Sequence, residues 1–142
     1  MHVSFPAARR LSVVLGLLVL PAVAPGQEKQ NPLVSQVKAT VPDPGKPFTL
    51  LIRFEAKPGA GPKLEAAFAR AVALTRKEKG CLAYDLSRDA KAPTRYLVYE
   101  RWQNVDALAA HQDSAHIAAL RKEIADLRVA PPQAEVLIPV GE

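Results

Sequence analysis

The chain has 142 residues, of which 49% are hydrophobic and 23% charged, with 19 basic and 14 acidic side chains and a net charge of +5. This length suits one domain, and these proportions exclude a disordered, collagen-like or disulfide-scaffold chain. A single cysteine, Cys81, excludes an intrachain disulfide. Basic and acidic residues alternate along the chain and do not form a basic stripe with interleaved aromatics, so nucleic acid is not an expected partner.

Residues 1–26 have the three parts of a secretory signal peptide. Arg9 and Arg10 form a basic start, an apolar run extends from Leu11 to Leu20, and small residues and prolines follow. A helix needs about 20 apolar residues to span a bilayer, so this run is too short for a membrane anchor. We expect cleavage before Gln27 and an exported protein, periplasmic or secreted, with no stable membrane anchor after cleavage.

Residues 27–47 are predicted to be a proline-rich linker. Five prolines lie between positions 25 and 47, among polar residues. Proline lacks a backbone donor and disrupts helix interiors, so this composition argues against a helix and against a central strand. A short strand within residues 33–39 remains an alternative, because Leu33, Val34 and Val37 are apolar.

A folded domain is predicted over residues 48–142. Bulky apolar residues predict a strand over 48–56, and apolar positions at three- and four-residue spacing predict a helix from Pro62 to near Gly80. Two further strands, 81–88 and 96–102, form a hairpin. A second helical region follows, with caps at Asn104 and Ser114, and ends before Pro131. The last strand covers 134–140.

The order β-α-β-β-α-β predicts an α+β, ferredoxin-like fold, with a four-stranded antiparallel sheet and two helices on one face. The other face of such a sheet is uncovered. Leu51 would expose apolar surface there, with whichever of Ala83, Leu97 and Leu137 point the same way. We therefore expect a homodimer joined through the open sheet face.

Several motifs in the right order resemble the antibiotic biosynthesis monooxygenase (ABM) family. They are Ala56-Lys-Pro-Gly59, the segment from Lys79 to Tyr84, Tyr99-Glu-Arg-Trp102, the segment from Asp106 to His111, and Ser114-Ala-His116. The resemblance covers about residues 48–140. It implies a dimeric α+β barrel and a quinol-monooxygenase-like enzyme that oxidises a small aromatic phenol or quinol with dioxygen and needs no cofactor.

The family is catalytically mixed, and it also includes haem-degrading enzymes and members without an assigned reaction. Haem-degrading relatives use an asparagine, a tryptophan and an axial histidine, and the corresponding positions here hold Ile52, His111 and Arg121. None of the three matches, so haem degradation is the less favoured branch.

His111 and His116 are the leading candidates for a catalytic base, because histidine transfers protons near neutral pH. Their five-residue separation turns them about 140° apart on an ideal helix, so they face one target only if the helix breaks at Asp113-Ser114. Both could instead be structural, His111 as a packing residue and His116 as a first-turn residue near the cap.

Glu100 and Trp102 share one face of their strand with Tyr96 and Val98, because side chains alternate along a strand. If that face points to the helices, Glu100 is buried and needs a partner, for which Arg53 and His111 are candidates. Glu100 is therefore a third catalytic candidate, with a structural salt bridge as the alternative.

The candidate substrate-binding residues are Trp102, Tyr84, Arg53 and Phe68. Trp102 could equally be a core residue. Cys81 has no adjacent constellation of histidine and aspartate and no second cysteine to pair with, which favours a small buried residue over a nucleophile. No phosphate-binding loop, zinc spacing or dinucleotide fingerprint occurs, so neither a cofactor nor a metal is expected.

A second class of function remains open. The same fold can bind a small hydrophobic molecule, or only pair subunits, without oxygen chemistry. The two interpretations differ in whether a cavity between helices and sheet is open and carries a base, or is plugged by Phe68, Trp102 and Leu120.

Overall fold

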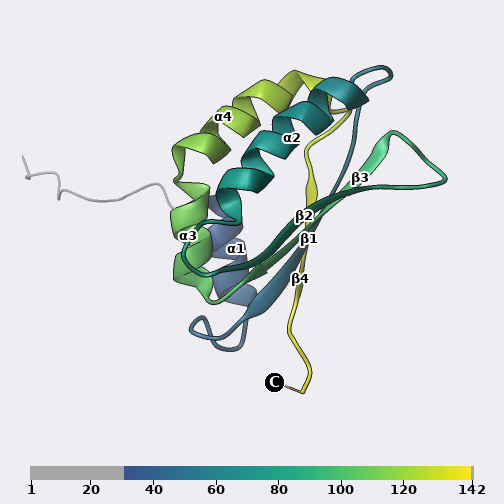
Figure 1. Ribbon diagram of the computed structural model, residues 1–142. Helices are drawn as coiled ribbons and strands as arrows, with labels where there is room; N and C mark the ends of the chain where they lie inside the picture. The colour runs from purple at the N-terminus through teal and green to yellow at the C-terminus, as the bar shows by residue number, and fades with distance from the viewer. Residues whose placement is uncertain (1–30, 142) are drawn as a thin grey trace, which may run out of the picture.

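The computed structural model describes residues 31–141, and these residues form one antiparallel sheet with all the helices on one face (Figure 1). The sheet order is β2-β3-β1-β4. The elements, in chain order, are α1 (Pro32–Thr40), β1 (Phe48–Glu55), α2 (Gly61–Thr75), β2 (Cys81–Arg88), β3 (Arg95–Trp102), α3 (Val105–Gln112), α4 (Ala115–Ile124), a single 3-10 turn (Ala125–Leu127) and β4 (Gln133–Leu137). The predicted ferredoxin-like α+β fold is confirmed.

The strand register decides which side chains face the helices. Phe48 on β1 pairs with Trp102 on β3, and Leu50 pairs with Glu100. The even-numbered residues of both strands therefore share one face, and Phe48, Leu50 and Trp102 are completely buried there. The predicted shared face of Tyr96, Val98, Glu100 and Trp102 on β3 is confirmed, and it points to the helices, since all four residues are buried.

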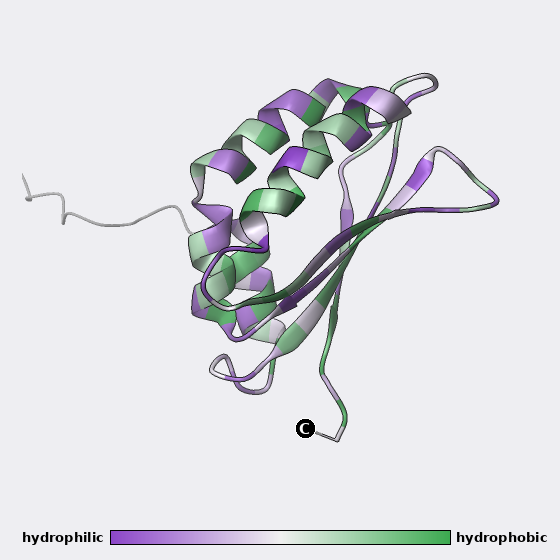
Figure 2. Cartoon of the chain, in the orientation of Figure 1, coloured by the Kyte–Doolittle hydropathy of each residue, from purple (hydrophilic) through white to green (hydrophobic). Residues whose placement is uncertain are grey.

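Amphipathic helices cover this face in two pairs. Helices α2 and α4 lie side by side over one half of the sheet, and α1 and α3 lie over the other (Figure 1). Their hydrophobic residues gather on the side toward the sheet, and polar residues cover the outside (Figure 2). From α2, Phe68 stacks on Phe54 of β1 with ring centroids 5.5 Å apart, which ties the helix layer to the sheet.

Helix α1 contradicts the prediction that residues 27–47 are only a linker. Pro32 occupies the first turn, where a missing backbone donor costs nothing, and the Asn31 side chain caps the helix by accepting from the Leu33 backbone N–H at 2.9 Å. The prolines at 42, 44 and 47 fall after the helix. Val37 is fully buried in the core, so α1 is part of the folded unit.

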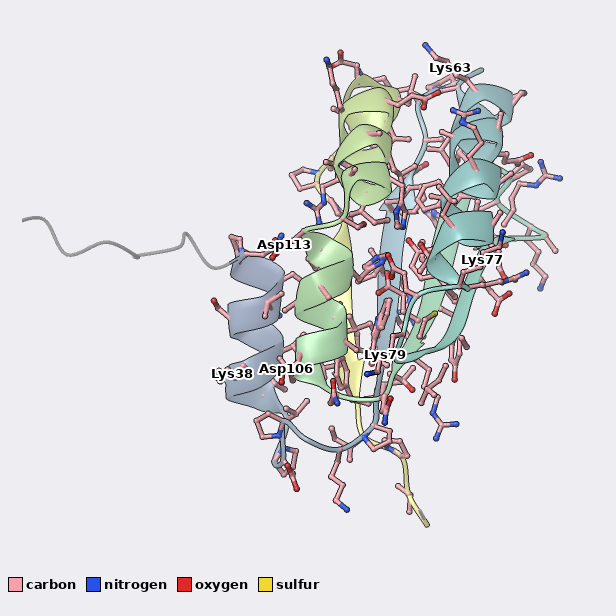
Figure 3. All side chains as sticks on the ribbon, turned by 60° about the vertical axis from the view of Figure 1, so that its left-hand side comes forward. Lys38, Lys63, Lys77, Lys79, Asp106 and Asp113 are labelled. Atoms are coloured by element: carbon pink, nitrogen blue, oxygen red, sulfur yellow. The ribbon has the colours of Figure 1, made fainter. Side chains whose placement is uncertain are left out.

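The second helical region breaks where the sequence allowed it to break. Helix α3 begins at the Asn104 cap, whose side chain accepts from the Ala107 N–H at 2.9 Å, and ends before Asp113. The Ser114 hydroxyl then donates to the His111 carbonyl at 2.7 Å, and α4 begins at the next residue. Figure 3 shows α3 between Asp106 at its start and Asp113 at its end.

The face of the sheet away from the helices has no cover in this chain. The register places Leu51, Leu97, Tyr99 and Leu137 on it. Leu51 and Leu97 are half-buried, while Tyr99 and Leu137 are 37% and 40% exposed. We call these four residues the outer apolar patch. It agrees with the expectation of an exposed apolar sheet surface.

The predicted signal peptide at 1–26 and the predicted new terminus at Gln27 lie outside the described residues. Within residues 31–141, no helix is long and apolar enough to cross a membrane.

Candidate active site

A cavity of about 310 Å³ lies between the helices and the sheet. We call it the central cavity. Strands β1, β2, β3 and β4 form its floor, and α1, α2, α3 and α4 form its walls. Its lining includes Ile52, Phe68, Tyr84, Val98, Glu100 and His111. Two groups capable of proton transfer therefore share an otherwise largely apolar space with a buried phenol.

Glu100 is the buried carboxyl of this cavity, and its side chain comes from the second half of β3. The residue is only 4% exposed, and the Trp102 indole N–H donates to Glu100 Oε2 at 3.0 Å. Burial raises the pKa of Glu100 to about 7, and the negative charge of Glu78 acts in the same direction. The hydrogen bond from Trp102 and the charge of Arg121 oppose this shift.

Arg53 is not the partner of Glu100, which corrects one prediction. Arg53 is an odd-numbered residue of β1, so it lies on the outer face of the sheet, whereas Glu100 lies on the helix face. There Arg53 forms an ion pair with Glu135 of β4 at 2.6 Å, with both side chains about half exposed. It also borders a separate open hollow, and it does not line the central cavity.

His111 is buried and lines the same cavity from α3, and both His111 and Glu100 contact Trp102. Its ring centroid lies 4.6 Å from that of Trp102 and 5.4 Å from that of Tyr84. Burial lowers the pKa of His111 to about 3, with smaller contributions from His116 and Arg121, so the imidazole is neutral at neutral pH. A neutral ring that donates from Nδ1 keeps Nε2 as an acceptor.

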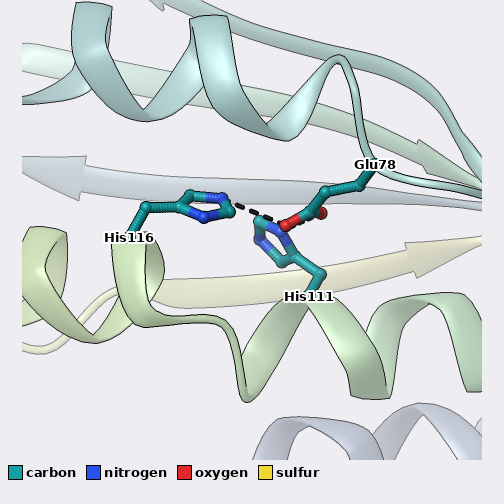
Figure 4. Close-up of side chains that lie close together, drawn as sticks. All are labelled: Glu78, His111 and His116. Carbon is teal, nitrogen blue, oxygen red and sulfur yellow. Dashed lines mark hydrogen bonds and ion pairs between the residues drawn. The ribbon is translucent and has the colours of Figure 1, made fainter.

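Glu78 holds both histidines. His111 Nδ1 lies 2.8 Å from Glu78 Oε2, and His116 Nε2 lies 3.0 Å from Glu78 Oε1 (Figure 4). The two histidines were expected to face one target only if the helix broke at Asp113-Ser114. The helix does break there, and both rings point toward Glu78. His116 itself is not part of the central cavity lining; it borders a small hollow between α2 and α4.

Sequence reasoning missed Glu78. The residue lies in the turn between α2 and β2, two positions before Gly80. Gly80 has φ = 84°, and a Cβ added to it would lie 2.6 Å from the Cβ of Ala107. A glycine therefore lets this turn approach α3 closely, which places Glu78 beside His111. The sequence shows a glycine that can end a helix at position 80, but it does not show that this glycine contacts α3.

The other predicted binding residues are divided between the cavity and the core. Phe68 and Tyr84 line the central cavity, and burial raises the pKa of the Tyr84 phenol, which keeps it protonated as a donor. Trp102 is completely buried behind Glu100 and His111 and does not line the cavity. Of the two alternatives for this cavity, the structure has the open one, since Phe68, Trp102 and Leu120 do not plug it.

The cavity lining also carries polar residues that were not among the predicted catalytic or substrate-binding residues. Gln112 and Arg121 line it, and the Arg121 guanidinium donates to both the Gln112 backbone carbonyl and its side-chain oxygen. Arg128 also lines the cavity, and burial lowers the pKa of its guanidinium. Two cationic side chains therefore belong to the lining of a mainly apolar cavity.

Comparison with known proteins identifies relatives of this arrangement. Residues 47–123 match the family described as antibiotic biosynthesis monooxygenase. A protein of Mycobacterium tuberculosis named "Putative monooxygenase Rv0793" is 31% identical over 96 residues, which cover 68% of this chain and 94% of the relative. Its solved structure aligns with a TM-score of 0.64 over 68% of this chain and 98% of that chain.

Two further matches widen the comparison. The crystal structure of PA3566 from Pseudomonas aeruginosa is 28% identical and aligns with a TM-score of 0.64, over 70% of this chain and 99% of that chain. A haem oxygenase (mycobilin-producing) of Mycobacterium tuberculosis is 33% identical over 73 residues, which cover 51% of this chain and 70% of the relative. By the extent of these matches, the chain belongs to the antibiotic biosynthesis monooxygenase family.

Proposed function

We propose that the protein is a monooxygenase that oxidises a small aromatic phenol or quinol with dioxygen in the central cavity, without a bound cofactor. The observation that carries this proposal is a buried carboxyl, Glu100, with a pKa near 7 in an open and mainly apolar cavity. A base with that pKa is half ionised at neutral pH, which suits proton removal from a phenol.

The size of the cavity supports a small substrate. Ligand pockets in proteins range from about 300 to 1,000 Å³, and the central cavity lies at the lower end of that range. Ile52, Phe68 and Val98 offer apolar surface to an aromatic ring. Tyr84 supplies a phenolic donor, and neutral His111 supplies a ring nitrogen as acceptor, so the substrate oxygens have polar partners in the wall.

The proposed reaction needs no external reductant. Trp102 holds Oε2 of Glu100, and the carboxylate takes the proton of the substrate hydroxyl. The resulting phenolate gives electrons to dioxygen, and one oxygen atom bonds to a ring carbon that carries hydrogen. A hydroquinone and dioxygen thereby give a hydroxyquinone and water. The ring loses four electrons in total, and the second oxygen atom leaves as water with two hydrogens of the substrate.

Haem degradation is the less favoured branch of the family. The three positions that haem-degrading relatives use hold Ile52, His111 and Arg121 here, and all three line the central cavity. The axial histidine position is therefore an arginine that hydrogen-bonds to Gln112. The cavity thus lies at the place that haem occupies in those relatives but lacks the histidine that would bind the iron. This favours a smaller aromatic substrate over haem.

Oxygen consumption tests the proposed function. The full chain is assayed with a panel of hydroquinones and naphthols, with a metal chelator present throughout, beside Glu100→Gln and the control Glu123→Gln, an exposed carboxyl of α4 that is ion-paired with Arg70. We expect turnover above autoxidation in the wild type and the control, and a loss of at least about 100-fold in Glu100→Gln. Saturable binding of these phenols without oxygen consumption would instead support a ligand-binding module.

We also propose that the chain forms a homodimer through the outer apolar patch. Leu97, Tyr99 and Leu137 present apolar surface on an uncovered sheet, and a second copy of the same face would bury it. Sedimentation of the wild type at micromolar concentration should give a dimer, and Leu97→Glu should give a folded monomer. A monomeric wild type would contradict this.

Export is a further proposal, based on residues 1–26. Cell fractionation of the full chain should recover a shortened protein outside the cytoplasm that begins at Gln27. Recovery of the unshortened chain in the cytoplasm would contradict it.

A further inference from the structure

We propose that Glu78, His111 and His116 form a binding site for a divalent transition-metal ion of the Zn²⁺ class. The three side chains come from two separate parts of the chain, the turn after α2 and the break between α3 and α4 (Figure 4). One ligand atom from each residue lies within 4.8 Å of the other two. Among residues 31–141, no other group of three such side chains converges in this way.

The distances are close to those that a metal requires. Zinc binds imidazole nitrogen and carboxylate oxygen at about 2.0 to 2.2 Å, which places tetrahedral ligand atoms about 3.3 Å apart. Glu78 already lies 2.8 Å from His111 Nδ1 and 3.0 Å from His116 Nε2. Small side-chain shifts therefore convert two hydrogen bonds into metal bonds.

The surroundings fix one ligand and leave the others accessible. The His111 side chain is 1% exposed and packs on the Trp102 ring, so its orientation is set by the core. The side chains of Glu78 and His116 are each 20% exposed. A metal ion can therefore reach the site from solvent, and a water molecule can take the fourth position.

The hydroxyl groups around His116 add support from the next layer. Thr75 Oγ1 lies 3.2 Å and Ser114 Oγ lies 3.5 Å from His116 Nε2. These hydroxyls can hydrogen-bond to a metal-bound water or to the Glu78 carboxylate, which is the usual role of groups outside the ligand set. Ser114 also holds the chain break in place through its bond to the His111 carbonyl.

The donor set indicates which ions bind. Two imidazoles and one carboxylate suit Zn²⁺, Co²⁺, Ni²⁺, Cu²⁺ and Fe²⁺, whereas Mg²⁺ and Ca²⁺ prefer oxygen ligands in larger numbers. Glu78 and His116 lie outside the lining of the central cavity, so metal binding can be measured without the proposed oxygenase reaction. His111 belongs to both sites, and a metal ion on its Nδ1 would leave the ring proton on Nε2.

Calorimetry with ZnCl₂ tests the site on the full chain without an affinity tag. We expect one Zn²⁺ per chain, no saturable heat with MgCl₂, and with CoCl₂ the visible absorption of a tetrahedral nitrogen- and oxygen-bound ion. His116→Ala and Glu78→Gln should each weaken Zn²⁺ binding by about 100-fold or more, since even changes outside the ligand set cost 10- to 100-fold.

The matched control is Asp113→Asn, which removes one negative charge from the exposed chain break next to the site. Its Zn²⁺ affinity should stay within a few-fold of the wild type. His116→Ala is the preferred ligand variant because His116 is partly exposed, and circular dichroism checks that it remains folded. Absence of saturable Zn²⁺ binding to the wild type, or equal weakening by Asp113→Asn and Glu78→Gln, would overturn the proposal.

Discussion

Replacing Glu100 with glutamine should make the protein more stable, and the gain should grow with pH. Burial gives the Glu100 carboxyl a pKa of about 7 in the folded protein, against an ordinary value of 4.5. The unfolded chain therefore loses this proton at lower pH than the folded chain. As pH rises from about 4.5 through about 7, the unfolded state binds fewer protons and the wild type loses stability.

The structure sets the size of this effect. A shift of one pKa unit corresponds to 1.36 kcal/mol, so the full shift costs the wild type on the order of 3 kcal/mol at high pH. Glutamine keeps an oxygen to accept the Trp102 indole N–H and carries no charge that burial could penalise. Between pH 5 and pH 8.5, Glu100→Gln should therefore gain about 2 to 3 kcal/mol relative to the wild type.

Urea denaturation followed by far-UV circular dichroism measures this difference at both pH values. Trp102 fluorescence is unsuitable, because the only tryptophan contacts the substituted side chain. Glu123→Gln, at an exposed site, is the control and should show a much smaller pH-dependent change. If the stability difference between wild type and Glu100→Gln were the same at pH 5 and pH 8.5, the reasoning about the buried carboxyl would be refuted.

Three further substitutions test other parts of the structure. Trp102→Phe removes a donor to ionised Glu100, so the pH midpoint of oxygen consumption should rise by about 1 to 2 units, and an unchanged or lower midpoint would contradict the hydrogen bond's role. Asn104→Ala removes the cap of α3 and should lower the free energy of unfolding by about 1 kcal/mol in thermal denaturation; no loss would argue against that cap. Arg53→Ala should leave KM for an oxidised phenol unchanged, because Arg53 lies on the outer sheet face, and a raised KM would place it back in the substrate site.

The order of strands and helices could be predicted from the sequence because local patterns determine it. Alternation of side chains placed Glu100 and Trp102 on one face of β3, and residue spacing placed the caps at Asn104 and Ser114. Helix α1 was missed because the number of prolines was weighed without their positions. Pro32 lies in the first turn, where proline is favoured, and a cap residue, Asn31, precedes it.

The candidate site depended on information that is not local. Whether Arg53 could meet Glu100 is decided by the pairing of β1 with β3, and a sequence does not state that register. Glu78 reaches His111 only because Gly80 lets the turn after α2 approach α3. The convergence of His111 and His116 could be predicted in part. Their spacing requires a helix break at Asp113-Ser114 before both rings can face one target, and the structure shows that break.

The position of β4 has a consequence for the order of folding. β4 pairs with β1 across a long stretch of chain, so that Arg53 and Glu135, which are bonded to each other, are 82 residues apart. The β2–β3 hairpin and the helices are more local contacts and can form earlier, because closing a long loop costs more entropy. Until this five-residue strand docks, β1 is the edge strand of the sheet, paired only with β3. Ala134, which lines the central cavity, is then missing from its floor. We therefore expect the cavity to be completed among the last steps of folding. Local opening of the cavity should first be detected as fast hydrogen exchange of the backbone amides of β4.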